Sequence, residues 1–178
     1  MNTGSLPSRA TFALLALLLF TSATATSYRE LSLQEIFTAT EVGFVATVAS
    51  SSVEMRGDMP WTVVEFEVQR WLAGDGAENR VRLAFLGGSR PGGASLQVNL
   101  MPGFEVGERV MVLAYDEEYY SPIVGFNQGV WRLRDQALLD AQGRQLSLAD
   151  DGRLLADGPG VEPQLVIDAV ARELEARQ

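Results

Sequence analysis

The chain has 178 residues, with 14 basic side chains against 23 acidic ones and a formal net charge of −9. It contains no cysteine and no histidine, and all of its basic residues are arginines. These absences exclude disulfides, Ser/His/Asp and Cys/His catalysis, Schiff-base chemistry and the usual His or Cys metal sites. The composition therefore predicts no metal and no cofactor, and the negative charge predicts no nucleic acid partner.

An apolar segment at the N-terminus is typical of a secretory leader. Arg9 precedes an unbroken apolar run from Phe12 to Phe20, and Ala23-Thr24-Ala25 places small residues where a signal peptidase cleaves. The run is about half of the roughly 20 residues that span a bilayer, which disfavours a retained anchor as the alternative. We expect residues 1–25 to be a signal peptide and the mature chain to be a periplasmic or extracellular bacterial protein without a stable membrane span.

A short helix is the first element expected in the mature chain. Ser32 and Glu35 stand three residues apart, the spacing at which a hydroxyl and a carboxylate cap a helix reciprocally. One helical face then carries Leu33, Ile36, Phe37 and Thr40. We expect this face to close one end of a core.

The pattern changes to strands from Val42 onwards. A strand at Val42–Val48 is separated by a polar stretch, Ser50–Pro60, from two segments that alternate apolar and polar residues, Trp61–Leu72 and Arg80–Leu86. After the glycine-rich loop Gly87–Gly93, further strands are expected at Arg109–Tyr115, Ile123–Phe126, Val130–Arg134, Ala137–Leu139 and Gln145–Leu148. Many short strands at a spacing of about ten residues indicate a barrel or a sandwich.

The C-terminal segment, residues 150–178, is predicted to be rich in turns and to end in an amphipathic helix. Pro163 suits the first helical turn. Two ion pairs at i,i+4 spacing, Asp168 with Arg172 and Glu173 with Arg177, support the helix. Its apolar stripe is expected to pack on the preceding β-barrel domain, which we place at residues 26–149.

Several strand and turn markers follow one another between about Ser32 and Leu133. They are the capped helix, the strand Val-Gly-Phe-Val-Ala-Thr-Val, Trp71-Leu72-Ala73-Gly74, Gly87-Gly88, the Phe104/Gly107/Glu108 turn, and Val124-Gly125 before Gly129-Val130-Trp131. This order resembles a family of uncharacterised exported bacterial domains that are similar to OB-fold barrels of the TIMP and netrin type. The resemblance implies a mainly β fold, an OB-like small barrel of five to seven strands with an N-terminal and a C-terminal helix. It implies no catalytic residues, and the cysteine through which TIMP inhibitors chelate zinc is missing.

Two glutamates offer the only spacing that suits an enzyme. Glu65 and Glu67 share one face of a predicted strand, with Cβ atoms about 7 Å apart. That spacing is compatible with the acid/base pair of an inverting glycosidase. A solvated strand face explains both residues equally well, so a carboxylate-based hydrolase is the alternative function.

Three loops combine acids or glycines in a way that suggests ion binding. Asp116-Glu117-Glu118-Tyr119-Tyr120, and Asp150-Asp151-Gly152 with Asp157, lack the ligand spacing of a calcium loop and are expected to be a charged hairpin tip and an ordinary turn. Gly87–Gly93 with Arg90 has the glycine content of a phosphate cradle, but no helix is predicted to follow it. As a long loop on rigid strands, it is a predicted docking position for a partner.

Aromatic side chains are the remaining binding candidates. Trp61, beside Pro60 at the start of a strand, could stack on a sugar or anchor a protein, and Tyr119 and Tyr120 could do the same. Together with Arg90 they form the predicted binding set, while packing in the core is the alternative for each ring. We expect an exported, non-enzymatic module that recognises a protein or a glycan, with a hydrolase or a structural envelope component without ligand as alternatives.

Overall fold

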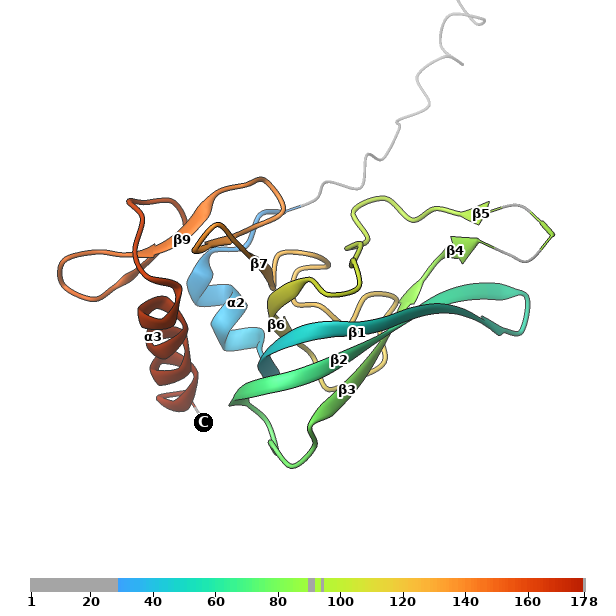
Figure 1. The fold of residues 1–178 in the computed structure, drawn as a ribbon, viewed down its shortest axis with the longest axis horizontal. Coiled ribbons are helices and arrows are strands. Elements are labelled where there is room, and N and C mark those ends of the chain that lie inside the picture. The colour runs from blue at the N-terminus through green and yellow to red at the C-terminus, as the bar shows by residue number, and fades with distance from the viewer. Residues whose placement is uncertain (1–28, 90–91, 94, 178) are drawn as a thin grey trace, which may run out of the picture.

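A computed structural model of the chain describes residues 29–89, 92–93 and 95–177 (Figure 1). The predicted leader with its cleavage site, and Arg90, lie outside these residues. The described helices are α2, Leu33–Ala39, and α3, Pro163–Glu175. The described strands are β1 Val42–Arg56, β2 Met59–Ala73, β3 Arg80–Leu86, β4 Gly88–Ser89, β5 Ser95–Leu96, β6 Arg109–Ala114, β7 Val130–Arg134, β8 Ala137–Leu139, β9 Gln145–Leu148 and β10 Leu154–Leu155.

Eight strands form one sheet in the order β10-β9-β8-β7-β6-β1-β2-β3, and β4 pairs with β5 in a separate ladder. Every pairing between neighbours is antiparallel. The predicted mainly β class is thus confirmed. In the described part of the chain β3 and β10 are the outer strands, so the sheet is open, and the predicted closed barrel of five to seven strands is not confirmed.

The hairpin of β1 and β2 is longer than the sequence pattern predicted. The two strands stay paired from Gly43 with Ala73 to Arg56 with Met59, so the polar stretch expected to separate them is part of the ladder. The β1 residues of this stretch, Ser50–Arg56, are all exposed and are held by backbone hydrogen bonds to β2, which is why polarity alone was misleading. Gly57 makes the reversal at φ 59°, a conformation that glycine adopts without strain.

The strand predicted at Ile123–Phe126 is wrong. Only Ile123 bridges to a neighbour, Ala114, and the chain then turns with positive φ at Gly125 and Phe126. Ser121 donates its hydroxyl to the Phe126 carbonyl at 2.6 Å and so holds the turn. The apolar run reflects burial, since Ile123 is fully buried, and a buried turn shares that property with a strand.

Helix α2 begins at the capping box that its sequence predicts. The Glu35 carboxylate accepts the backbone N–H of Ser32 at 2.8 Å, and the Ser32 hydroxyl accepts the N–H of Glu35 at 3.3 Å. Ile36 and Phe37 are the buried residues of the helix. The short helix is thereby fixed at its start by hydrogen bonds and along its inner face by packing.

Helix α3 begins with Pro163 in its first turn and packs against β2. The predicted pair of Glu173 with Arg177 is present at 2.6 Å. Asp168 forms its ion pair with Arg70 of β2 instead of with the predicted partner, Arg172. The last helix is therefore tied to the sheet by an ion pair as well as by its apolar stripe.

Two groups of buried apolar side chains make up the core of the described residues. Phe44, Phe66 and Phe85 belong to the group formed by β1, β2, β3 and β6. The other group joins both helices to the sheet and includes Phe37 and Ile167. Figure 1 shows the helices towards one end of the molecule and the tip of the β1–β2 hairpin at the other. Among the described residues, no helix has the length and apolar character needed to cross a bilayer.

Candidate functional site

A groove lies between β3 and the segment that links β6 to the following turn, residues 115–122. We call it the β3 groove. Its volume is about 400 Å³, and its walls come from β3, from the β1–β2 hairpin and from residues 115–122. Of the predicted binding residues, Trp61 and Tyr119 line the groove, and Tyr120 contacts Trp61. The structure therefore brings together three of the four predicted residues, which are far apart in the chain.

The aromatic side chains of the groove touch one another. The ring centroids of Trp61 and Tyr120 are 6.1 Å apart, and those of Tyr115 and Tyr119 are 5.0 Å apart at an edge-on angle of 65°. Tyr119 is 47% exposed and Tyr120 is 64% exposed. Rings so exposed are available to a partner, and neighbouring rings hold them in place.

Arg56 is a site residue that the sequence did not reveal. Its guanidinium carbon lies over the Trp61 ring, 4.9 Å from the centroid, and its Nη1 lies 3.6 Å from the Glu118 carboxylate. The cation thus covers one face of Trp61. Arg56 belongs to the polar stretch predicted to separate two strands, and nothing in that stretch indicated a contact with a tryptophan.

The segment 115–122 gives the groove an acidic wall. Glu118 pairs with Arg56, but no cationic side chain of the described residues pairs with Asp116 or Glu117. The Tyr119 hydroxyl donates to the Glu117 carboxylate at 2.9 Å, and this hydrogen bond raises the pKa of the Tyr119 phenol. The wall therefore carries two carboxylates that a cationic partner could neutralise.

The backbone of β3 presents an open edge to the same groove. Gly87 donates its N–H to Pro60 of β2, whereas Leu86 donates its N–H in the other direction, to the carbonyl of Tyr120 at 2.8 Å. Neighbouring residues of a strand point their backbone groups to opposite sides. The backbone N–H and C=O groups of Arg82 and Ala84 therefore point away from β2, as those of Leu86 do. Both line the β3 groove.

Among the described residues, no hydrogen bond reaches the backbone groups of Arg82 or Ala84 on this side. The Arg82 side chain turns to Glu54, with which it pairs at 2.8 Å. Two consecutive outward positions of β3 thus offer free backbone donors and acceptors. Alternation of side chains cannot reveal such an edge, because it carries no information about which neighbour a strand lacks.

The glycine-rich loop is only partly described. Gly88 and Ser89 form β4, which pairs with β5. Gly88 has φ 140°, and a Cβ atom there would lie 3.0 Å from the Val53 side chain, so glycine allows close packing on the β1–β2 hairpin. The fourth predicted binding residue, Arg90, lies outside the described residues.

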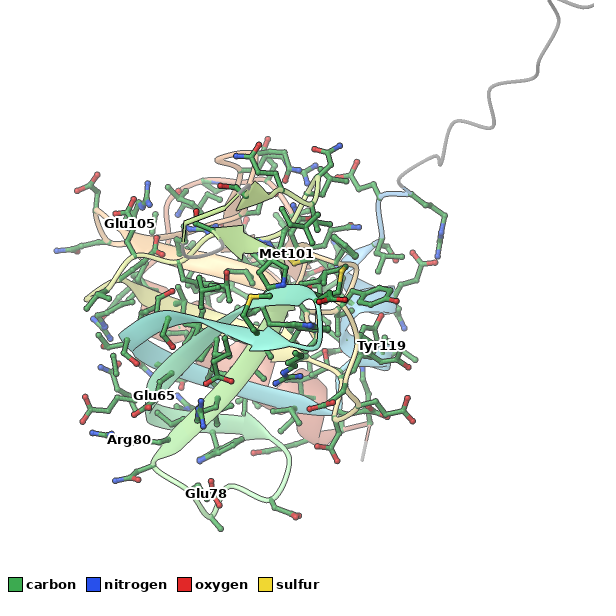
Figure 2. The ribbon with its side chains drawn as sticks, turned by 90° about the vertical axis from the view of Figure 1, so that its right-hand side faces the viewer. Glu65, Glu78, Arg80, Met101, Glu105 and Tyr119 are labelled. Atoms are coloured by element: carbon green, nitrogen blue, oxygen red, sulfur yellow. The ribbon has the colours of Figure 1, made fainter. Side chains whose placement is uncertain are left out.

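The glutamates of the hydrolase hypothesis lie elsewhere. Glu65 accepts a hydrogen bond from Arg80 at 2.6 Å, and neither Glu65 nor Glu67 lines the β3 groove or four further grooves on the described residues. Figure 2 shows Glu65 and Arg80 together on one side of the view and Tyr119 on the other. The hydrolase hypothesis predicts a concave pocket at these glutamates beside a second carboxylate, and none of these five grooves provides it.

Larger grooves are also present on the described residues, with volumes of about 560, 720 and 940 Å³. A groove of about 940 Å³ near the start of α3 contains Glu108, but this carboxylate already binds Arg132 at 3.0 Å and Arg134 at 2.9 Å. Among the described residues there is no group of three or more carboxylates placed to hold a metal ion. Trp131 is 3% exposed and packs in the core.

Comparisons of the chain with family models, with curated proteins and with solved structures find no match. The resemblance to exported OB-like domains therefore rests on the strand and turn markers of the sequence.

Proposed function

We propose that this chain is an exported, non-enzymatic module that binds a protein partner through the β3 groove. The observation that carries the proposal is the meeting of Trp61, Tyr119 and Tyr120 around one groove, with both tyrosines largely exposed. Tyrosine and tryptophan are enriched among residues that contribute most to protein interfaces. The predicted leader supports a location outside the cytoplasm.

A protein partner is favoured over a glycan by the surroundings of Trp61. A sugar ring stacks on an open aromatic face, but Arg56 covers one face of this ring and Tyr120 lies beside it. The groove also offers backbone hydrogen-bonding groups, which recognise another polypeptide. A glycan-binding module and a hydrolase based on Glu65 or Glu67 are outcomes that the experiment distinguishes.

The test compares four forms of the purified chain, immobilised and exposed to envelope and secreted fractions of the source organism. We expect a protein that is retained by the wild type and lost with Trp61→Ala and with Tyr120→Ala. The matched control is Glu65→Gln, which changes a partly buried charge paired with Arg80 on the other side of the molecule and should retain the same protein. The retained protein is then purified, and its affinity for the four forms is measured by calorimetry.

Equal affinity of the groove variants and the wild type would overturn the proposal. Binding of a purified glycan that depends on Trp61, measured on a carbohydrate array, would replace it with the glycan module. Release of reducing sugar from a polysaccharide, abolished by Glu65→Gln, would replace it with the hydrolase.

A further inference from the structure

We infer that the open edge of β3 takes an extended, cationic peptide segment of the partner as an added strand. This inference rests on the proposed function, since it specifies how the β3 groove recognises its partner. It commits to one occupant, a segment with arginine or lysine side chains in an extended conformation.

The first argument is the direction of the backbone groups. Val81, Leu83 and Phe85 are the positions at which β3 bonds to β2, because Gly87 and Asn79 bracket them with bonds to Pro60 and Val68 of β2. The outward positions between them are Arg82 and Ala84, each with one N–H and one C=O. An extended segment beside them would form about four main-chain hydrogen bonds, the mode in which peptides add to sheet edges.

The second argument is the position at which the edge ends. The Tyr120 carbonyl accepts the N–H of Leu86, and no backbone hydrogen bond among the described residues joins the segment 115–122 to Arg82 or Ala84. An added strand would lie about 4.8 Å from β3. The β3 groove lies along the same positions, and its volume of about 400 Å³ provides space beside Arg82 and Ala84.

The third argument is charge complementarity. The two arginines that line the groove are already paired, Arg82 with Glu54 and Arg56 with Glu118. The carboxylates of Asp116 and Glu117 are not paired with any cation of the described residues. Since alternate side chains of an added strand point to opposite sides, one set of its side chains can reach this acidic wall.

The experiment uses the isotope-labelled chain and a hexapeptide of alternating arginine and valine. Backbone amide signals are followed by NMR during titration. We expect saturable shifts and slower hydrogen exchange at the amides of Arg82 and Ala84. A hexapeptide of alternating glutamate and valine should bind at least about tenfold more weakly, because it meets Asp116 and Glu117 with like charge.

Two substitutions at one position separate the backbone from the side chain. Ala84→Pro removes the outward N–H without removing a bond to β2, and we expect it to weaken binding of the arginine–valine peptide about tenfold. Ala84→Val keeps the N–H and also enlarges the side chain, so it should weaken binding clearly less than Ala84→Pro does. Thermal unfolding checks that both variants are folded.

A second route avoids changing the protein. The arginine–valine hexapeptide methylated on alternate backbone nitrogens loses the donors that would face β3, and it should bind at least about tenfold more weakly than its unmethylated form. Binding unaffected by methylation, absence of shifts at Arg82 and Ala84 up to millimolar peptide, or a dimer of the chain formed through β3 in sedimentation measurements would overturn the inference.

The failure of this inference is distinct from the failure of the proposed function. A protein partner lost with Trp61→Ala but retained by Ala84→Pro would leave the groove as the binding site and remove the added strand. Equal binding of the partner by both variants and by the wild type would overturn both the added strand and the proposed function.

Discussion

Leu86 of β3 donates its backbone N–H to the carbonyl of Tyr120 at 2.8 Å, and the Tyr120 ring lies 6.1 Å from the ring of Trp61. Tyr120 therefore holds the end of β3 with its backbone, and its side chain contacts Trp61, which lines the β3 groove. A substitution at Tyr120 changes the ring and leaves the backbone bond in place. This separation allows the binding surface to be altered without opening the structure.

Removing the Tyr120 ring should affect binding far more than folding. The side chain is 64% exposed, so Tyr120→Ala is expected to change the free energy of unfolding by less than about 1 kcal/mol. Denaturant unfolding measures this change, and the calorimetric affinity for the partner measures the loss of binding. A destabilisation above about 2 kcal/mol would show that the ring is structural and would contradict the prediction.

Replacing Gly129 should destabilise the turn before β7. A Cβ atom at Gly129 would lie 2.3 Å from the carbonyl oxygen of Leu113, which forces the backbone apart. Gly129→Ala is expected to lower the free energy of unfolding by about 2 kcal/mol or more. The control is Gly103→Ala, since a Cβ atom at Gly103 has no neighbour within 4 Å, and it should shift the value by less than about 0.5 kcal/mol. Similar values for the two variants would be inconsistent with this packing.

The capping box of α2 should make the helix sensitive to acid. The hydrogen bond from the Ser32 backbone and that from the Arg29 guanidinium lower the pKa of Glu35 from 4.5 to about 2. Because the folded-state pKa is depressed, the stabilisation is present above pH 4.5 and is lost as the pH falls towards 2. Amide exchange at Ile36 and Phe37 should accelerate over this range in the wild type. In Glu35→Gln the acceleration should be smaller, and equal profiles would refute the assignment.

The acidic wall should be visible in the titration of Tyr119. The hydrogen bond to Glu117 raises the pKa of the Tyr119 phenol, so Glu117→Gln should return that pKa towards its ordinary value. NMR of the tyrosine ring signals during alkaline titration measures the change. Glu65→Gln, on the other side of the molecule, is the control and should leave the Tyr119 pKa where it is. A Tyr119 pKa that does not fall in Glu117→Gln would mean that the two side chains do not interact in solution.

Local patterns predicted most of the elements that carry the groove. The bounds of β3 agree with the alternating segment Arg80–Leu86, because a strand with one buried face repeats every second residue. Trp61 and both tyrosines were also predicted as binding residues from their types and positions. Their meeting in one groove depends on the register of distant strands, which no local pattern encodes.

The features that sequence analysis missed have a common cause. Arg56 ends a run of β1 residues, Ser50–Arg56, that are all exposed, so no pattern of burial marked this part of the strand. Ile123 and its neighbours are buried in a turn, so their apolar character suggested a strand. The open edge of β3 exists because β3 is an outer strand of the sheet in the described part of the chain. In each case the hydrophobic pattern indicated which residues are buried. The β3 groove instead depends on which strands pair with each other and on the edge of β3 that pairs with no strand of the described residues.

At the tip of the β1–β2 hairpin, the two walls of the β3 groove are joined by a weak contact. Arg56 links the end of the hairpin to Glu118 across 3.6 Å, and the Glu118 side chain is 90% exposed, so this ion pair is screened by solvent. Changing the width of the β3 groove at this end therefore requires little energy. Under the proposed function, a groove that widens at this end would admit side chains of different sizes, and the partner would be selected by chain conformation and charge while its sequence could vary.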